Sequence, residues 1–334
     1  MFAITAGRCA PGVSLGLLVF LLSFCGCGNS PQNSSGQPAK LRIAMIPKGT
    51  THQFWKSVHY GADQAARELD VELIWQGPLK EDDRQDQINT VDNFITKGVD
   101  GICLAPLDKN ALLNVVKSAG KNKIPTVIFD SALADPAAAV SYVATDNYNG
   151  GVLAARELGR LLNGQGKIIL LRYAEGSEST EQREKGFLDT VAKEFPQLEF
   201  LSQEQYAGAT VQTALQVAKQ LLVKHGDQVQ GIFAVNESCA TGMLKALRDA
   251  KLAGKVKFIG FDTGEELRGG LETGEVHGLI LQNPIKIGNL SVKTVVASLR
   301  GEQVEPNQPT GEMLATPANR TDPAVQALLV PRQL

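Results

Sequence analysis

The chain has 334 residues, more than one small domain usually contains, so two domains are expected. Its 33 Lys and Arg residues nearly balance its 35 Asp and Glu residues, and the net charge of −2 argues against a protein that coats nucleic acid or an anionic membrane. Hydrophobic residues make up 43% and charged residues 20%, which suits a globular α/β protein and, with a single apolar segment at the N-terminus, excludes a multi-span channel or permease.

The first residues have the features of an export signal. Arg8 is the only charged residue before Lys40, and an apolar run follows it over residues 13–24. A run of that length is too short to span a bilayer comfortably and is typical of the core of a signal peptide. We therefore expect residues 1–26 to be a signal peptide.

A cysteine stands at the end of this segment. Gly26, a small residue, directly precedes Cys27, an order that resembles the processing site of bacterial lipoproteins. Residues 27–40 are rich in Ser, Gly, Pro and Gln, which is typical of a flexible tether. We expect Cys27 to be lipidated and the protein to lie in the periplasm or at the cell surface, held to the membrane by that lipid only. Ordinary signal cleavage and an uncleaved anchor are the alternatives.

From residue 41 onward, short apolar runs alternate with amphipathic stretches. The runs are rich in Val, Ile and Leu without strict alternation, as in parallel strands that are covered on both faces. Strands are predicted in the first half over residues 41–47, 71–76, 101–105, 126–129 and 140–144. Helices with apolar residues at three- and four-residue spacing are predicted over residues 54–69, 83–96 and 111–119.

The second half repeats this alternation. Strands are predicted over residues 167–171, 198–201, 231–234, 257–261 and 278–281. Helices are predicted over residues 150–162, 182–194, 211–224, 238–251 and 265–273, and a helix over 287–299 and a strand over 312–315 follow. The predicted fold is α/β, with two doubly wound parallel-sheet domains.

Polar residues gather where several predicted strands end. These segments are Lys48 to Trp55, Asp130-Ser131, Asn236-Glu237-Ser238, Asp262-Thr263 and Gln282-Asn283-Pro284. Because the carboxyl ends of parallel strands meet at one edge of a sheet, the segments of each domain are expected to converge. Carboxylates among amides and aromatic rings suit the holding of a ligand better than acid–base catalysis.

No catalytic or metal-binding signature is present in the sequence. It lacks a GxxxxGK[ST] phosphate loop, a GxSxG nucleophile motif, an HExxH motif and a GxGxxG motif after the first strand. Its four histidines are not spaced as metal ligands, so neither a metal nor a cofactor is predicted. Cys103 and Cys239 are isolated, which predicts buried apolar residues, with a disulfide between them as the alternative.

A series of short motifs resembles one protein family in order and spacing. The series comprises Phe54-Trp55 and residues 98–102 (GVDGI), 105–106 (AP), 124–127 (IPTV), 145–147 (TDN), 183–187 (REKGF), 233–237 (FAVNE) and 259–262 (IGFD). From about residue 41 to residue 315, the chain is similar to the exported sugar-binding proteins of ABC importers, of the ribose-binding type. That family is the type I group of periplasmic binding proteins.

The resemblance implies two domains joined by a multi-strand hinge. The chain would cross between them near Thr145, Gln282 and Gly311. The first domain would then comprise residues 41–145 and 283–311, and the second domain residues 146–282 and 312–334.

The resemblance also implies a ligand site, in which each contact residue of the family is matched to one residue of this sequence. Phe54 and Trp55 match the family's aromatic positions, Asp130 its first-domain carboxylate and Arg183 its second-domain arginine. Its remaining polar contacts correspond to Asn236, Asp262 and Gln282. These residue types fit a sugar, because an aromatic ring covers its C–H face, carboxylates accept from its hydroxyls, and Arg or Asn donates to them.

The sequence departs from the family at three positions. Lys48 stands where a small hydroxyl residue is common, His52 where ribose binders have an amide, and Ser131 where an arginine often follows the carboxylate. Lys48 and His52 are included among the predicted ligand contacts, and the departures leave the identity of the sugar open.

Each predicted contact also has a structural alternative. The two aromatic residues could pack in the core, and the Asp and Asn side chains could cap helices. Arg183 could pair with Glu184, and Lys48 and His52 could face solvent.

The resemblance implies a receptor that binds a small sugar in a cleft and passes it to an ABC permease and its ATPase. It also implies a protein that is not an enzyme and binds no nucleic acid. A receptor of the same fold that presents a sugar or autoinducer to a membrane sensor kinase or chemoreceptor is the main alternative. An exported hydrolase and the effector domain of a regulator are further alternatives, but no helix-turn-helix precedes residue 41.

Overall fold

The computed structural model describes residues 39–330 and 332. The predicted signal peptide, the predicted lipidation site Cys27 and nearly all of the predicted tether lie outside these residues. In the part of the chain that is described, no helix is both long enough and apolar enough to cross a bilayer.

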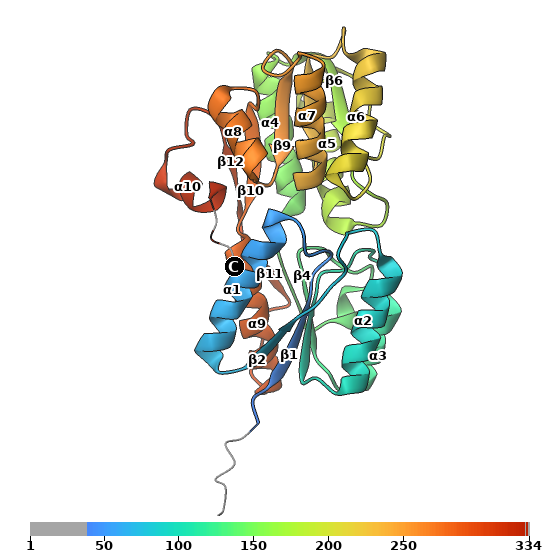
Figure 1. Cartoon of the computed structure of the whole chain (residues 1–334), viewed down its shortest axis with the longest axis vertical. Coiled ribbons are helices and arrows are strands. Elements are labelled where there is room, and N and C mark those ends of the chain that lie inside the picture. The colour runs from blue at the N-terminus through green and yellow to red at the C-terminus, as the bar shows by residue number, and fades with distance from the viewer. Residues whose placement is uncertain (1–38, 331, 333–334) are drawn as a thin grey trace, which may run out of the picture. The chain divides into compact units, whose positions relative to one another are not determined.

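The first sheet has six parallel strands in the order β11-β5-β4-β3-β1-β2. They are β1 (Arg42–Ile46), β2 (Glu72–Trp75), β3 (Gly101–Leu104), β4 (Thr126–Phe129), β5 (Ser141–Ala144) and β11 (Asn307–Pro309). Helices α1 (Gln53–Leu69) and α9 (Pro284–Leu299) lie on one face, and α2 (Arg84–Lys97) and α3 (Leu113–Lys121) on the other (Figure 1). A short 3-10 helix, η1 (Pro136–Ala138), precedes β5.

Strand β1 is apolar from Ile43 to Ile46 because both faces of its sheet are covered. Ile43 and Met45 belong to one buried cluster with residues of α1 and α9, whereas Ala44 and Ile46 belong to a second cluster with residues of α2 and α3. A strand with one face in water would instead alternate apolar and polar residues. The unbroken apolar runs of the sequence therefore reflect burial on both faces.

The second sheet has the order β12-β10-β9-β8-β6-β7, with only β12 antiparallel. Its strands are β6 (Gln165–Leu171), β7 (Gln197–Ser202), β8 (Gly231–Ala234), β9 (Lys257–Phe261), β10 (Gly278–Gln282) and β12 (Glu312–Ala315). The helices that accompany it are α4 (Asn147–Leu161), α5 (Glu178–Glu194), α6 (Val211–His225), α7 (Glu237–Asp249), α8 (Glu265–Thr273) and α10 (Pro323–Leu329). Two doubly wound α/β units are thus confirmed as the fold.

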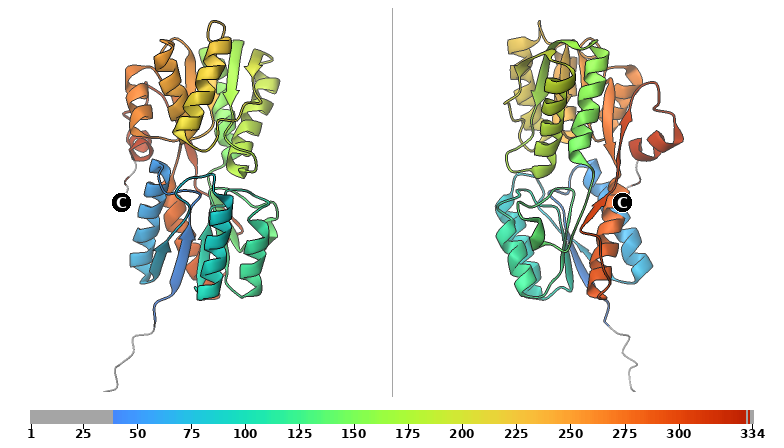
Figure 2. Two further views of the ribbon diagram at one scale, coloured as in Figure 1. Left: turned by 45° about the vertical axis from the view of Figure 1, so that its right-hand side comes forward. Right: turned by 180° about the vertical axis from the view of Figure 1, so that it is seen from behind.

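We call each sheet with its helices a lobe. The chain passes from one sheet to the other after β5, after β10 and between β11 and β12. As a result, two elements from the C-terminal part of the sequence lie in the first lobe, where α9 packs beside the N-terminal α1 and β11 pairs with β5 (Figure 2). The two helices pack closely, because a Cβ on Gly288 of α9 would lie only 1.9 Å from the carbonyl oxygen of Val58 in α1.

The structure places several helix starts earlier than periodicity predicted. Helix α4 begins at Asn147, α5 at Glu178 and α9 at Pro284, against predicted starts at residues 150, 182 and 287. The first turns of these helices carry polar and capping residues, so apolar periodicity begins one turn late. Strand β11 was not predicted, because its three residues include no buried residue and so leave no apolar run in the sequence. Helix α10 was not predicted either.

Both cysteines of the folded body are buried and free. Cys103 lies in β3 and Cys239 in α7, in the interiors of different lobes. They therefore serve as small apolar core residues, and the alternative of a disulfide between them is wrong.

Candidate functional site

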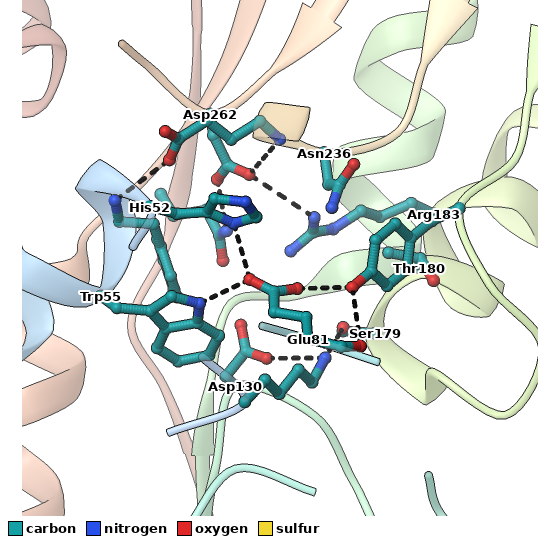
Figure 3. A pocket seen from close by; sticks show the side chains of 14 residues that line it. His52, Trp55, Glu81, Asp130, Ser179, Thr180, Arg183, Asn236 and Asp262 are labelled. Carbon is teal, nitrogen blue, oxygen red and sulfur yellow. Dashed lines mark hydrogen bonds and ion pairs between the residues drawn. The ribbon is translucent and has the colours of Figure 1, made fainter. Parts of the chain in front are cut away.

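A small cavity lies between the two lobes, at the strand ends where polar residues gather. All nine residues predicted as ligand contacts line it: Lys48, His52, Phe54, Trp55, Asp130, Arg183, Asn236, Asp262 and Gln282 (Figure 3). Sequence reasoning missed five further lining residues, which are Glu81, Tyr173, Ser179, Thr180 and Glu237. The structure thus brings segments from both lobes to one cavity.

Lys48 and Asp130 form one ion pair of the cavity wall. Lys48 follows β1, and its Nζ lies 3.0 Å from an oxygen of Asp130, which follows β4. The same ammonium donates to the hydroxyls of Ser177 and Ser179 on the second lobe, at 3.3 and 3.0 Å. Lys48 is 3% exposed, so the alternative in which it faces solvent is wrong.

Asp130 is held in an unusual backbone conformation. Its φ of 62° lies in the left-handed region that residues other than glycine rarely adopt. No helix begins at Asp130, so the alternative in which it caps one is wrong. Strain of this kind is concentrated at functional sites, where the surroundings fix a side chain in place.

The aromatic pair serves the core and the cavity together. Phe54 and Trp55, in the first turn of α1, contact each other edge to face with ring centroids 4.8 Å apart. Both are buried in the first-lobe core and both line the cavity. The core alternative is therefore correct for both rings, and because both also line the cavity, contact with a ligand stays a prediction for them.

Glu81, between β2 and α2, is the centre of a hydrogen-bonded cluster. Its carboxylate accepts 2.6 Å hydrogen bonds from Trp55 Nε1 and from the hydroxyl of Tyr173 on the second lobe. It also lies 2.6 Å from His52 Nδ1. Figure 3 shows Glu81 between Trp55 and His52 on one side and the second lobe on the other.

The ion pair between His52 and Glu81 fixes the charge of both groups. Burial by itself would raise the pKa of Glu81, but the attraction and hydrogen bond of His52 hold it at about 2. Burial would likewise lower the pKa of His52, but Glu81 raises it to about 9. Both groups are therefore charged at neutral pH, and His52 does not face solvent.

Arg183 in α5 is anchored from three sides. Its Nε donates to Asn147 at 2.9 Å, its Nη1 donates to the carbonyl oxygen of Val235 at 3.0 Å, and the guanidinium lies over the Phe261 ring at 3.7 Å. The start of α4 reaches α5 because Gly151 has no side chain, since a Cβ there would lie 2.0 Å from the Arg183 carbonyl oxygen.

The predicted alternative pairing of Arg183 is wrong. Glu184, its neighbour in the sequence, pairs instead with Arg172 at 2.7 Å. Successive residues of a helix point in different directions, and the side chain of Arg183 is directed to the cavity. Its nearest carboxylate is Asp262, with 4.0 Å between Nη1 and Oδ2.

Asp262 and Asn236 cap α7 as well as lining the cavity. Asp262 Oδ2 accepts from the backbone N–H of Glu237, the first residue of α7, at 3.0 Å. Asn236 is the N-cap residue, and its side chain accepts from the N–H of Cys239 at 3.1 Å. Burial raises the pKa of Asp262. The capping alternative is thus correct for both residues, and it does not remove them from the cavity.

Gln282 connects this wall to the crossing strands. Its Nε2 donates to Asp262 Oδ1 at 2.6 Å, and its Oε1 accepts from the hydroxyl of Thr145 at 2.6 Å. Thr145 follows β5, whereas Gln282 ends β10, so the bond joins two of the places where the chain passes between lobes.

Glu237 spans the two lobes. Its carboxylate accepts from the backbone N–H groups of Gln53 and Phe54 at the start of α1, each at 3.1 Å. Burial raises its pKa to about 7. The sequence could have indicated Glu237 as a lining residue, because it directly follows Asn236 at a polar strand end. Glu81 lies in a loop away from any such strand end, so no feature of the sequence indicated its place in the cavity.

Three cations and four carboxylates line the cavity. Each cation faces a carboxylate in the pairs Lys48–Asp130, His52–Glu81 and Arg183–Asp262. No group of three or more His, Cys, Asp or Glu side chains suited to a metal ion is found within the described residues. The cavity can therefore hold a polar ligand through hydrogen bonds and aromatic contact.

Two doubly wound lobes around a polar, aromatic-lined cavity define a ligand-binding protein of the two-lobed class. Residues 43–303 match the periplasmic binding protein domain, and the chain belongs to that family. The family serves transporters by binding their substrates, so the chain is a binding protein and not an enzyme.

Individual relatives share most of the chain. The ribose import binding protein RbsB of Salmonella typhimurium is 30% identical, over 83% of this chain and 90% of that protein. Two solved structures are each 33% identical. A carbohydrate transporter solute binding protein of Agrobacterium radiobacter, in complex with D-arabinose, has a TM-score of 0.84 over 88% of this chain and 100% of that one. An ABC transporter solute binding protein of Agrobacterium vitis, with bound D-fucose, has a TM-score of 0.83 over 86% and 100%.

Proposed function

We propose that this chain is the substrate-binding component of an ABC importer, which binds a small neutral sugar between its lobes and delivers it to a permease and its ATPase. The observation that carries the proposal is the lining of the cavity, where two aromatic rings lie beside ion pairs from both lobes. A relative named for ribose import and neighbours solved with D-arabinose and D-fucose support the same ligand class.

The lining offers the groups that a sugar ring requires. Phe54 and Trp55 supply apolar surface for its C–H face. Arg183 Nη2 and the amide nitrogen of Asn236 have no protein partner among the described residues, so both are available to donate to hydroxyls. Asp130 and Asp262 supply acceptors. Buried hydroxyls must be paired, which is how such a site rejects a wrong epimer.

The charged groups of the cavity are already engaged, which favours a neutral ligand. Each cation of the cavity already faces a carboxylate, and the fourth carboxylate, Glu237, already accepts from two N–H groups at the N-terminus of α1, while burial raises its pKa to about 7. A ligand carboxylate or ammonium would therefore be buried without a counter-charge, which is costly. We expect sugar acids and amino sugars to be rejected.

The same residues couple ligand binding to closure of the lobes. Lys48, Glu81 and Glu237 each bond directly to the opposite lobe, through Ser179, Tyr173 and the start of α1 respectively. A sugar that contacts both lobes adds to these bonds and shifts the population toward the closed form. The hinge would lie at the crossings near Thr145, Gln282 and Gly311, which divide the chain into residues 41–145 with 283–311 and residues 146–282 with 312–334.

Location and anchoring belong to the same proposal. A signal peptide over residues 1–26, lipidation of Cys27 and a tether over residues 27–40 would hold the receptor beside its permease in the periplasm or at the cell surface. The tether composition favours this arrangement, because a Ser- and Gly-rich segment leaves the folded body free to dock.

A thermal-shift screen tests the ligand class. Pentoses, hexoses, polyols, inositols, sugar acids and amino sugars are compared on the purified chain. A neutral sugar at about 100 times its Kd should stabilise the fold by roughly 2.7 kcal/mol, enough to raise the Tm by several degrees. Arg183→Ala should abolish most of that shift. Stabilisation by charged sugars alone, or by no sugar, would contradict the proposal.

A further inference from the structure

Glu81 is a carboxylate whose oxygens are engaged by protein donors. Oε1 accepts from Trp55 Nε1 and lies 2.6 Å from His52 Nδ1, and Oε2 accepts from the Tyr173 hydroxyl. Its side chain is 7% exposed. A Cβ on Gly49 would lie 2.9 Å from Glu81 Cγ, so the loop after β1 makes room for this group. A carboxylate so fully engaged acts on its protein partners rather than on a ligand.

Among the partners of Glu81, His52 has a second ring nitrogen that is available to a ligand. Its Nδ1 faces Glu81, its ring lines the cavity, and its Nε2 has no hydrogen-bond partner within the described part of the chain. We propose that Glu81 is a positioning residue that holds His52 as an imidazolium, so that His52 Nε2 donates a hydrogen bond to a sugar hydroxyl. The proposal deepens the proposed function and rests on it.

The charged groups around His52 favour the imidazolium. Three carboxylates act on it from three different elements, Glu81 from the loop before α2, Glu237 from α7 and Asp262 from the end of β9. The other cations of the cavity, Lys48 and Arg183, each face a carboxylate of their own, Asp130 and Asp262. Burial raises the pKa of Tyr173, which therefore remains a neutral donor to Glu81.

The charge on His52 decides the direction of its second hydrogen bond. A neutral imidazole that donates Nδ1–H to Glu81 presents Nε2 as an acceptor, whereas an imidazolium presents Nε2–H as a donor. A charge-assisted hydrogen bond is roughly twice as strong as a neutral one. With the pKa of His52 at about 9 and that of Glu81 at about 2, the donor persists across the neutral pH range.

The first experiment measures the charge of His52 without a ligand. In full-length protein labelled with 15N-histidine, the His52 signal is assigned by its loss in His52→Gln. We expect it to titrate near pH 9 in the wild type. In Glu81→Gln, which keeps an acceptor but removes the charge, we expect a midpoint below about pH 7.5, closer to the unperturbed value.

Two variants control for loss of structure. Tyr173→Phe removes a donor from the same carboxylate but leaves its charge, so His52 should stay protonated at pH 7. Glu81→Asp keeps the charge and should keep the titration nearer that of the wild type, even if Glu81→Gln folds poorly. Equal midpoints in the wild type and Glu81→Gln, or a neutral His52 in the wild type at pH 7, would overturn the proposal.

The second experiment measures affinity for D-ribose and D-arabinose by calorimetry between pH 6 and pH 8. The wild type, in which Glu237 has a pKa of about 7, gives the baseline, and relative to it the affinity of Glu81→Gln should fall about tenfold as the pH rises and Nε2 loses its proton. A profile of Glu81→Gln that runs parallel to that of the wild type, beside a shifted titration, would refute the contact between Nε2 and the sugar. Failure of the wild type to bind either sugar would count against the proposed function with these probes, and the titration would still decide the role of Glu81.

Discussion

Asp262→Ala removes a carboxylate that both lines the cavity and caps a helix. Two donors lose their partner, the Gln282 amide at 2.6 Å and the Glu237 backbone N–H at 3.0 Å. Asp262 is 8% exposed, so these donors lose their partner in a largely dry environment. Unpaired buried donors cost about 1–3 kcal/mol each, and water in the cavity can replace part of that loss. We expect about 2 kcal/mol less stability.

The same change weakens sugar binding if Asp262 accepts from a hydroxyl. A charge-assisted hydrogen bond is worth about 1.5–3 kcal/mol, so affinity should fall roughly 10- to 100-fold. Arg183 keeps its bonds to Asn147 and Val235, which limits the loss of structure around it. Asp262→Asn should lie between the wild type and Asp262→Ala, because the amide oxygen can serve only one of the two donors well.

Calorimetry with a sugar found in the thermal-shift screen, beside melting curves without sugar, separates the two effects. Asp83→Ala is the matched control, since Asp83 caps α2 by accepting from the Asp86 N–H at 2.9 Å but does not line the cavity. It should cost about 1 kcal/mol of stability and leave affinity unchanged. Wild-type affinity in Asp262→Ala, with a lowered Tm, would reduce Asp262 to a structural cap and refute its role in binding.

Three other predictions concern closure, pH and anchoring. Small-angle scattering should give a smaller radius of gyration with saturating sugar, and an identical curve with binding confirmed separately would exclude hinge closure. The pKa of Glu237 is raised to about 7 in the folded chain, so the folded chain holds more protons than the unfolded chain between about pH 4.5 and 7, and stability should fall as the pH rises through that window. Glu237→Gln should lessen this decline in melting temperatures between pH 5 and 8, whereas an unchanged decline would place its cause elsewhere. Cys27→Ser should lose acyl labelling and release the protein from membranes or leave it unprocessed, and retention with unchanged labelling would contradict lipidation of Cys27.

The sequence alone determined the fold class, because buried parallel strands leave a local signal. The predicted bounds of β4, β8 and β9 agree with the structure residue for residue. Each is a short apolar run covered on both faces, so the run itself marks the strand. Where the local signal was absent, as in the three-residue β11, the strand was missed.

The sequence also indicated which residues would line the cavity, because the topology of a parallel sheet decides where they go. Asp130 and Asp262 follow β4 and β9 directly, and the carboxyl ends of the strands bring them to the cleft. Arg183, which is in a helix and not at a strand end, required the family resemblance, because nothing local distinguished it from an arginine on a solvated helix face.

Only the tertiary structure decided how these groups are paired. Glu81 bonds to Trp55 and to Tyr173, which are 26 and 92 residues away in the sequence, and Glu237 reaches Gln53 across 184 residues. Such partners share no motif or spacing, since Trp55 meets Glu81 only when the first lobe has folded, and the other two pairs meet only across the two lobes. Their charges follow from that meeting, because burial and a neighbouring ion move a pKa only when the fold has brought both to the same place.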